Sequence, residues 1–214
     1  GETATVVGGE TLLRWNNPDF GLIQPLEFLP ALETSGLIQK VGKWVLEESC
    51  RICKSWQTQG ISAIPISVNV STLQFKKEDF LSTVSEDRRK SELDGNMLEL
   101  ELTETCLMDN VEQSLDILIA LKDLGVRITI DDFGTGYSSL NYLKRFPIDV
   151  LKIDQSFVTN INERSQNENA AIVTAIMALS HSLRLDVVAE GVETANELAY
   201  LTALGCKTIQ GFLF

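Results

Sequence analysis

Residues 111–132 read VEQSLDILIALKDLGVRITIDD, and this stretch decides the fold class. Its first part, Val111–Leu124, spaces leucine and isoleucine near the 3.6-residue period of a helix, and Gly125 stands where a helix C-cap is expected. Its second part, Val126–Ile130, is a short run rich in β-branched residues, which is typical of a strand. Two aspartates follow directly. The stretch therefore predicts a helix that leads into a strand, with carboxylates at the C-terminal end of that strand.

The same alternation recurs along the chain. Further helices are expected over Ile38–Gln59, Glu168–Leu183 and Thr194–Leu204, the last with Thr194 as N-cap. Strands are expected over Val6–Leu13, Ile64–Val70, Met97–Leu102, Val126–Ile130, Val150–Ile153, Asp186–Ala189 and Lys207–Phe212. Because such alternation is typical of a parallel sheet with helices outside, the sequence predicts an α/β fold. Seven strands are close to the eight of a TIM-like (β/α)8 barrel, and an open doubly wound sheet is the structural alternative.

The composition suits one domain and excludes several classes of partner. The chain has 214 residues and is 44% hydrophobic, so we expect a single domain over residues 1–214. Its net charge of -12 argues against binding a DNA or RNA polymer, because phosphate binding depends on clustered Lys and Arg. The sequence shows no long apolar run and no secretory signal. Free thiols suit a reducing compartment, so the expected location is cytoplasmic. The four cysteines are expected as buried or semi-buried thiols, and the charged stretch Gln74–Asn96 as a solvated helix and connection.

Polar side chains gather near the C-terminal ends of the predicted strands. They are Glu10, Asn69, Glu101, Glu104, Asp131, Asp132, Lys152, Asp154, Glu190, Glu193 and Gln210. In a barrel these strand ends meet at one mouth, where such enzymes carry their active sites. A single acid after a strand is most often a helix cap or a loop residue. However, Glu10, Glu101 and Asp131 are expected to be buried acids, which are costly unless they are paired or bound to metal.

The chemistry of these groups favours a hard cation. Carboxylate and amide oxygens without His or Cys suit Mg²⁺ or Mn²⁺, and adjacent aspartates can serve two such ions. Two metal ions are a recurrent solution for phosphodiester cleavage. The acids alone do not exclude an unrelated metal-dependent barrel enzyme that acts on carbohydrates or enolates.

Several short motifs, each on its own predicted strand, follow one another in a specific order. They are Glu10–Leu12, Ser67–Ser71, Glu99–Glu104, Asp131–Leu140, Lys152–Asp154, Ala189–Glu193 and Gln210–Gly211. In this order they resemble the EAL domain, the bacterial cyclic di-GMP phosphodiesterase family, over almost the whole chain. The middle alanine of the motif that names the family is Thr11 here. The resemblance implies hydrolysis of cyclic di-GMP to linear pGpG with two Mg²⁺ or Mn²⁺ ions.

The resemblance also implies a role for each matching residue. The ligands of a first ion are Glu10, Asn69, Glu101 and Asp131, and those of a second are Asp131 and Asp132. The expected catalytic residues are Asp131, Asp132, Lys152 and Glu190. Lys152 would contact the catalytic water and phosphate, and Glu190 would act either as general base or as a water-mediated metal ligand. The expected substrate contacts are Leu12, Arg14, Asp154, Glu193 and Gln210. Glu104 is expected to anchor the loop Asp131–Leu140.

The family suggests partners as well. The loop is linked in the family to dimerisation, so a homodimer through residues 131–140 is expected. Family members commonly carry GGDEF, PAS or membrane sensory domains, which can anchor the parent protein in the inner membrane. We expect the chain to lack the family's first strand and its C-terminal helix. The alternative function is a catalytically inactive EAL-like module that serves as a cyclic di-GMP receptor or a protein-interaction domain.

Overall fold

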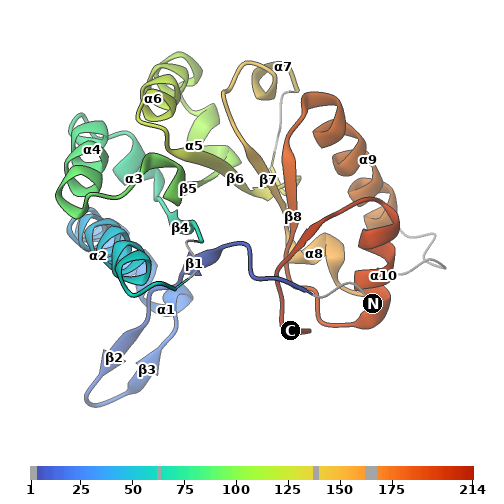
Figure 1. The fold of residues 1–214 in the computed structure, drawn as a ribbon, viewed down its shortest axis with the longest axis horizontal. Helices are drawn as coiled ribbons and strands as arrows, with labels where there is room; N and C mark the ends of the chain where they lie inside the picture. Colours follow the sequence, from blue (N-terminus) through green and yellow to red (C-terminus); the bar gives the residue numbers. More distant parts are fainter. Residues whose placement is uncertain (1–3, 62–63, 137–139, 162–167) are drawn as a thin grey trace. The chain divides into compact units, whose positions relative to one another are not determined.

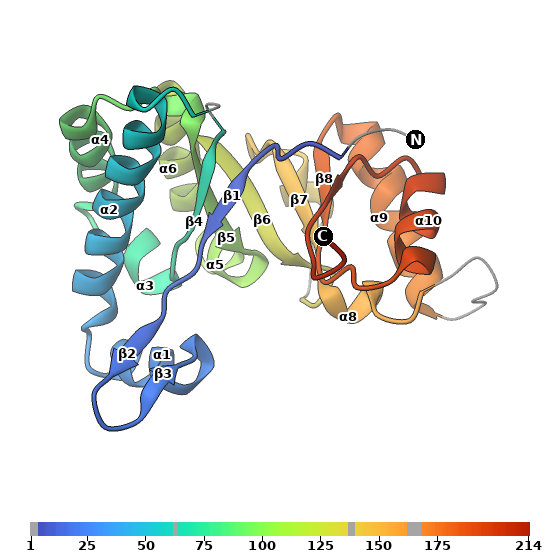
Figure 2. The same ribbon diagram turned by 60° about the horizontal axis from the view of Figure 1, so that its bottom comes forward.

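The computed structural model describes residues 4–61, 64–136, 140–161 and 168–214. The chain divides into two compact units, one of Gly1–Glu101 with Ala120–Arg127 and the other of Leu102–Ile119 with Ile128–Phe214. Each unit combines strands with helices, as Figure 1 and Figure 2 show. No helix in the described ranges is long and apolar enough to cross a membrane.

The first unit is built on parallel strands in the order β1-β4-β5. They are β1 (Gly9–Thr11), β4 (Ile66–Asn69) and β5 (Leu98–Thr103). An antiparallel hairpin of β2 (Trp15–Asn17) and β3 (Gly21–Ile23) follows β1. The helices are α1 (Pro25–Thr34), α2 (Ile38–Thr58), α3 (Thr72–Phe75), α4 (Phe80–Ser91) and the short 3-10 turn η1 (Gly95–Met97).

Helix α2 holds this unit together through one continuous face. Its buried residues are Ile38, Gly42, Leu46, Ser49, Cys50 and Cys53. They recur every three or four positions, as a helix that packs on one side requires. At Gly42 a Cβ atom would lie 1.7 Å from Nε2 of Gln74, so the absence of a side chain lets α3 approach closely. The face therefore fixes α2 against its neighbours in the unit.

The second unit repeats strand and helix along parallel strands in the order β6-β7-β8-β9. They are β6 (Arg127–Phe133), β7 (Val150–Ile153), β8 (Asp186–Ala189) and β9 (Thr208–Ile209). The remaining helices are α5 (Glu104–Met108), α6 (Val111–Asp123), α7 (Leu140–Leu143), α8 (Gln155–Val158), α9 (Glu168–Leu183) and α10 (Ala195–Ala203). Strand β7 is buried at all four residues, and Val150 pairs with Asp186 at the start of β8.

Most predicted elements are confirmed. The predicted strands Val150–Ile153 and Asp186–Ala189 and the helix Glu168–Leu183 have the bounds that the structure gives them. Thr194 caps α10 by accepting a hydrogen bond from the Glu197 amide. All four cysteines are buried and free, as expected. Burial raises the pKa of the Cys50 thiol to about 12, helped by the negative charge of Asp87, so this thiol stays protonated and unreactive at neutral pH.

Some sequence predictions were wrong in detail. The first and last predicted strands are shorter, since only Gly9–Thr11 and Thr208–Ile209 form strand. Strand β6 runs on to Phe133, so the paired aspartates lie within the strand and do not follow it. The stretch Gln74–Asn96 does contain a helix, α4, but three of its residues are buried, so it is not simply solvated.

Asp87 is one of these buried residues, and its environment is unfavourable for a charge. Its side chain is 0% exposed, and neither carboxylate oxygen accepts a hydrogen bond from any described residue. Its ion pair with Lys90 is long, at 3.8 Å from Nζ to Oδ1. Burial raises the pKa of Asp87 above its ordinary value, and the charges of Glu47 and Glu86 add to this while Lys90 and Lys43 oppose it.

We expect Asp87→Asn to raise the free energy of unfolding at pH 7 by about 1 kcal/mol, because it removes a buried charge. A carboxyl whose pKa is raised on folding destabilises the fold above that pKa and not below its unfolded value of 3.8. The advantage of the variant should therefore shrink as the pH falls. Urea unfolding at several pH values measures this, with the exposed acid Glu78→Gln, which is not among the charges that shift the pKa of Asp87, as control. Equal stability of the Asp87 variant and the wild type at pH 7 would contradict the prediction.

Candidate active site

In the first unit, neighbouring strands bring three predicted ligands together. Asn69 is paired in register with Glu101 on the adjacent strand. Its Nδ2 donates a hydrogen bond of 2.7 Å to Oε1 of Glu10 on β1. Glu101 is 3% exposed, whereas Glu10 is half-buried and Asn69 is exposed. The expectation of a buried acid is thus confirmed for Glu101 and wrong for Glu10, which lies at the more open edge strand.

The residue beside Glu10 explains how this chain accommodates its departure from the family motif. The Thr11 hydroxyl lies 3.0 Å from Oγ of Ser49 on α2, and Ser49 donates in turn to the Val45 carbonyl at 2.7 Å. Because successive strand side chains point to opposite faces, Thr11 contacts the helix while Glu10 faces the other way. The hydroxyl therefore ties β1 to α2 at the position next to the predicted ligand.

In the second unit, an irregularity of β6 gathers the paired aspartates. Consecutive residues of a regular strand face opposite sides. Here the pairing of β6 with β7 shifts between Ile130 and Phe133, and Asp132 has a φ of 53°. Its amide donates to Oδ1 of Asp131 at 3.0 Å. As a result, carboxylate oxygens of Asp131, Asp132 and Glu190 all lie within 4.8 Å of one another.

A lysine is held among these acids. Lys152 lies on the fully buried strand β7 and is 2% exposed. Its Nζ is 2.6 Å from Oε1 of Glu190 and 3.4 Å from Oδ1 of Asp131. Glu190 directly follows β8, and its amide donates to the Ile153 carbonyl at 3.1 Å. Three neighbouring strands therefore position one cation and three carboxylates. The expectation that Asp131 is a buried acid was wrong, because its side chain is only half-buried.

The electrostatics of this cluster fit a bound cation. Burial raises the pKa of Asp132, the negative charges of Asp131 and Asp154 raise it further, and Lys152 opposes the shift. The single positive charge of Lys152 therefore does not balance the negative charges of the neighbouring carboxylates. Since every candidate ligand atom is a carboxylate oxygen, the donor set suits a hard cation. The acidic cluster can hold a metal ion.

Two segments beside the cluster carry other predicted residues. Asp154 caps α8, since its Oδ1 accepts hydrogen bonds from the amide, at 3.0 Å, and from the hydroxyl of Ser156. The Gln210 amide donates to the Ala189 carbonyl at 2.9 Å, and its carbonyl accepts from the Val192 amide at 3.1 Å. A Cβ at Gly211 would lie 2.1 Å from the Val192 carbonyl oxygen, so only glycine allows this close packing beside Gln210.

Glu104 lies against the loop it was expected to anchor. It is 4% exposed, and neither of its carboxylate oxygens accepts a hydrogen bond within the described ranges. A Cβ at Gly136 would lie 3.2 Å from its Oε1, which places the carboxylate against the loop backbone. Residues 137–139 of the loop lie outside the described residues. The anchoring role stays a prediction that this proximity supports.

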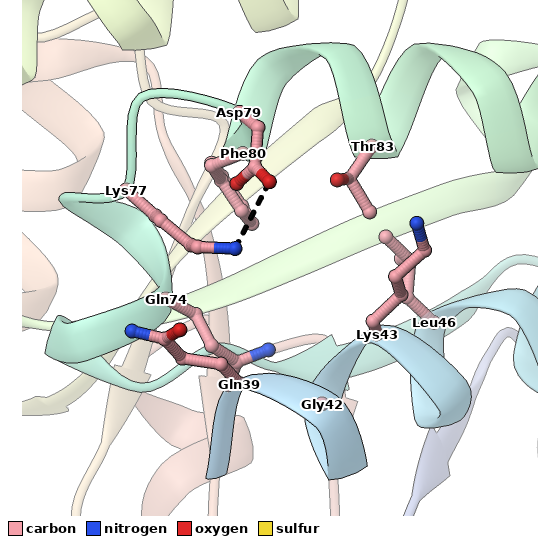
Figure 3. Close-up of a pocket in the computed structure, with 9 residues that line it drawn as sticks. All are labelled: Gln39, Gly42, Lys43, Leu46, Gln74, Lys77, Asp79, Phe80 and Thr83. Carbon is pink, nitrogen blue, oxygen red and sulfur yellow. Dashed lines mark hydrogen bonds and ion pairs between the residues drawn. The ribbon is translucent and has the colours of Figure 1, made fainter. Parts of the chain in front are cut away.

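Of the remaining predicted substrate residues, Glu193 lies after β8 in the second unit and is exposed, while Leu12 and Arg14 are in the first unit and face solvent. Leu12 is 55% exposed, and Nη1 of Arg14 donates to the Leu13 carbonyl at 2.8 Å. Figure 3 shows a hollow in the same unit, lined by residues of α2, α3 and α4 and the turn before α4. An ion pair of 2.9 Å between Lys77 and Asp79 lies at it. No predicted site residue is among those that line the hollow, so it is separate from the predicted site residues of this unit.

Sequence reasoning missed one polar residue of the second unit, Glu197. It is 4% exposed and accepts three backbone hydrogen bonds, from Asn160, Glu193 and Thr194. The spacing of Thr194 and Glu197 is that of a capping box, and this signal was available in the sequence. The bond to Asn160 was not, because it joins positions 37 residues apart.

Parallel strands that carry carboxylates and a lysine near their C-terminal ends are the arrangement on which barrel enzymes build their active sites. Residues 2–214 match the EAL domain family, and the chain belongs to it. The expected α/β fold with the TIM-like barrel of this family is confirmed by a solved relative, the PaMucR phosphodiesterase in complex with c-di-GMP. That structure has a TM-score of 0.93 and 47% identity, and the match covers 98% of this chain and 84% of that one.

Curated relatives share most of this chain but are much longer. The bifunctional diguanylate cyclase/cyclic di-GMP phosphodiesterase MucR of Pseudomonas aeruginosa is 47% identical over 97% of this chain and 30% of its own length. The cyclic di-GMP phosphodiesterase PdeR of Escherichia coli is 40% identical over 96% of this chain and 31% of its own. The chain thus spans less than a third of these relatives.

Proposed function

We propose that this chain is a metal-dependent phosphodiesterase that hydrolyses cyclic di-GMP to linear pGpG. The observation that carries the proposal is the cluster of Asp131, Asp132 and Glu190 around the buried Lys152. Membership of the EAL family and relatives named as cyclic di-GMP phosphodiesterases support the choice of substrate. In the reaction, water adds to one phosphodiester phosphorus and the bond to the ribose 3′ oxygen breaks.

Two Mg²⁺ or Mn²⁺ ions are the proposed cofactors. Asp131 and Asp132 would supply carboxylate ligands in the second unit. Glu10, Asn69 and Glu101 offer oxygen donors of the same chemistry in the first unit. When bound, such ions lower the pKa of water and offset the charge of a phosphate. They also explain how a chain with a net charge of -12 takes an anionic substrate, since the cations invert the local field.

Other side chains of the second unit would position the reacting groups and bind the substrate. Lys152 holds the Glu190 carboxylate in place through the 2.6 Å ion pair and brings a positive charge next to the reacting phosphate. Glu190 is the proposed general base that accepts a proton from water, or alternatively the residue that binds a metal-bound water, as the family resemblance implies. Asp154, Glu193 and Gln210 lie on the segments after β7, β8 and β9, where they contact the substrate in this proposal.

Incubation of the chain with cyclic di-GMP and either Mg²⁺ or Mn²⁺ tests the proposal. We expect linear pGpG to accumulate, and EDTA to stop its formation. A folded chain that binds cyclic di-GMP with Ca²⁺ in calorimetry but produces no pGpG with Mg²⁺ or Mn²⁺ would refute the enzyme and favour the receptor function. Turnover of other phosphodiesters without turnover of cyclic di-GMP would refute the substrate.

We also propose the setting in which the domain works. A homodimer through residues 131–140 follows from the family resemblance, and the position of the Glu104 carboxylate beside Gly136 supports a link between this acid and the start of the loop. A cytoplasmic location is supported by the buried free thiols, which suit a reducing compartment. GGDEF, PAS or membrane sensory domains in the parent protein are consistent with relatives more than three times as long as their match. Sedimentation of the chain with and without cyclic di-GMP tests the dimer.

A further inference from the structure

We infer that Glu197 is a positioning residue that fixes two segments with proposed substrate contacts. One is the segment after β7, which carries Asp154, and the other is the segment after β8, which carries Glu193. The inference deepens the proposed function and rests on it for the substrate. Glu197 itself lies on α10 and is 4% exposed, so its carboxylate acts through the backbone of other residues.

Each carboxylate oxygen has its own partners. Oε2 accepts hydrogen bonds from the amides of Glu193 at 2.9 Å and Thr194 at 3.0 Å. Oε1 accepts from the amide of Asn160 at 3.0 Å. A buried carboxylate with three N–H donors is strongly held, because hydrogen bonds to a charged acceptor are shorter and stronger than neutral ones. One side chain therefore joins three backbone positions from two segments of the chain.

Helix capping explains only part of this arrangement. In a capping box the glutamate at the third helical position reaches back to the amide of the N-cap residue, which here is Thr194. The bonds to Asn160 and Glu193 lie outside that motif. Asn160 has a φ of 64°, a left-handed conformation that asparagine adopts more readily than most residues. Its amide donates the bond to Oε1 of Glu197 from this conformation.

The joined segments are the ones that lead away from the cluster. The first starts at Lys152 on β7, passes Asp154 as the N-cap of α8 and reaches Asn160, two residues after the end of that helix. The second starts at Glu190 and reaches Glu193 three residues later. The carboxylate thus sets the distance between the backbones that carry Asp154 and Glu193, while the Lys152–Glu190 ion pair sets it nearer the strands.

The carboxylate is well suited to remain charged. Burial acts to raise the pKa of Glu197, but the hydrogen bonds from the amides of Glu193, Asn160 and Thr194 together hold that pKa below its ordinary value. The three amides are donors only, so a carboxylate is the acceptor that satisfies all of them. A carboxamide has one acceptor oxygen and would turn an N–H group toward at least one amide.

Glu197→Gln tests the inference against Thr194→Ala, which removes the capping hydroxyl but keeps the carboxylate. We expect Glu197→Gln to raise KM for cyclic di-GMP about tenfold, with kcat changed less than about threefold, because one charge-assisted hydrogen bond is worth roughly this factor. Thr194→Ala should leave KM within about twofold of the wild type. Hydrogen exchange by NMR should become faster at the Asn160 and Glu193 amides in the Gln variant alone.

The outcomes separate this inference from the proposed function. If the wild type hydrolyses cyclic di-GMP and both variants have the same KM as the wild type, Glu197 is only a helix cap and the inference fails. If the wild type shows no hydrolysis, the proposed function fails, while the exchange rates still test whether the carboxylate joins the segments. Should the Gln variant not fold, hydrogen exchange in the wild-type chain still tests the inference. Its Asn160 amide should exchange as slowly as a helical amide, and fast exchange would overturn the inference.

Discussion

Asp131→Asn lowers the rate of cyclic di-GMP hydrolysis by about a thousandfold or more in this account. Asp131 contributes to the carboxylate cluster, its Oδ1 is 3.4 Å from Nζ of Lys152, and the same oxygen accepts the Asp132 amide. The amide variant keeps the shape of the side chain but removes a negative charge and one of two ligand oxygens. Both losses weaken the hold on a divalent cation, so turnover at saturating substrate is the quantity to measure.

The matched control is Asp123→Asn, which neutralises an exposed carboxylate at the end of α6. It changes the net charge equally and should keep a rate within about twofold of the wild type. Circular dichroism shows that both variants are folded. If Asp131→Asn keeps near-normal turnover with either metal, Asp131 does not have the role assigned to it.

Lys152→Met is the second change with a large expected effect. We expect kcat to fall by about a hundredfold to a thousandfold, because the charge beside Glu190 and the reacting phosphate is lost. Without metal, the free energy of unfolding of the variant should be about 3 kcal/mol lower than that of the wild type, because Glu190 and Asp131 lose the lysine with which they pair. Mn²⁺ should restore part of that stability, since a bound cation offsets the same carboxylates.

Lys144→Met is the control for this change. Lys144 is an exposed lysine of the same unit, and its replacement should alter neither kcat nor the unfolding free energy appreciably. Steady-state kinetics and urea unfolding with and without Mn²⁺ give both quantities. A Lys152 variant with kcat within threefold of the Lys144 variant would show that the buried cation is dispensable for catalysis.

The sequence was a good guide where an element has a strong local signal. Strands β7 and β8 were predicted with their observed bounds, because short apolar runs end at polar residues there. Helix α1 was missed because Pro25 and Pro30 normally interrupt helices. Pro25, however, occupies the first helical turn, where a missing N–H costs nothing. The β2–β3 hairpin was missed because its strands have three residues each.

The site shows the same division between local and long-range information. The acids were found because they stand at strand ends, and most of them lie in the clusters described above. The bulge that turns Asp132 toward Asp131 could not be predicted, because it depends on the pairing of β6 with β7. The bond between Glu197 and Asn160 and the burial of Asp87 are likewise set by tertiary packing. Local sequence patterns therefore predict which residue types form the site, whereas tertiary packing determines their positions and hydrogen bonds.

The most direct test of the central claim is turnover of cyclic di-GMP in ¹⁸O-labelled water with Mn²⁺, followed by mass spectrometry of the products. The account predicts linear pGpG that carries one ¹⁸O atom in its terminal phosphate, and no product when EDTA is present. Unchanged cyclic di-GMP after prolonged incubation with the folded chain would contradict it.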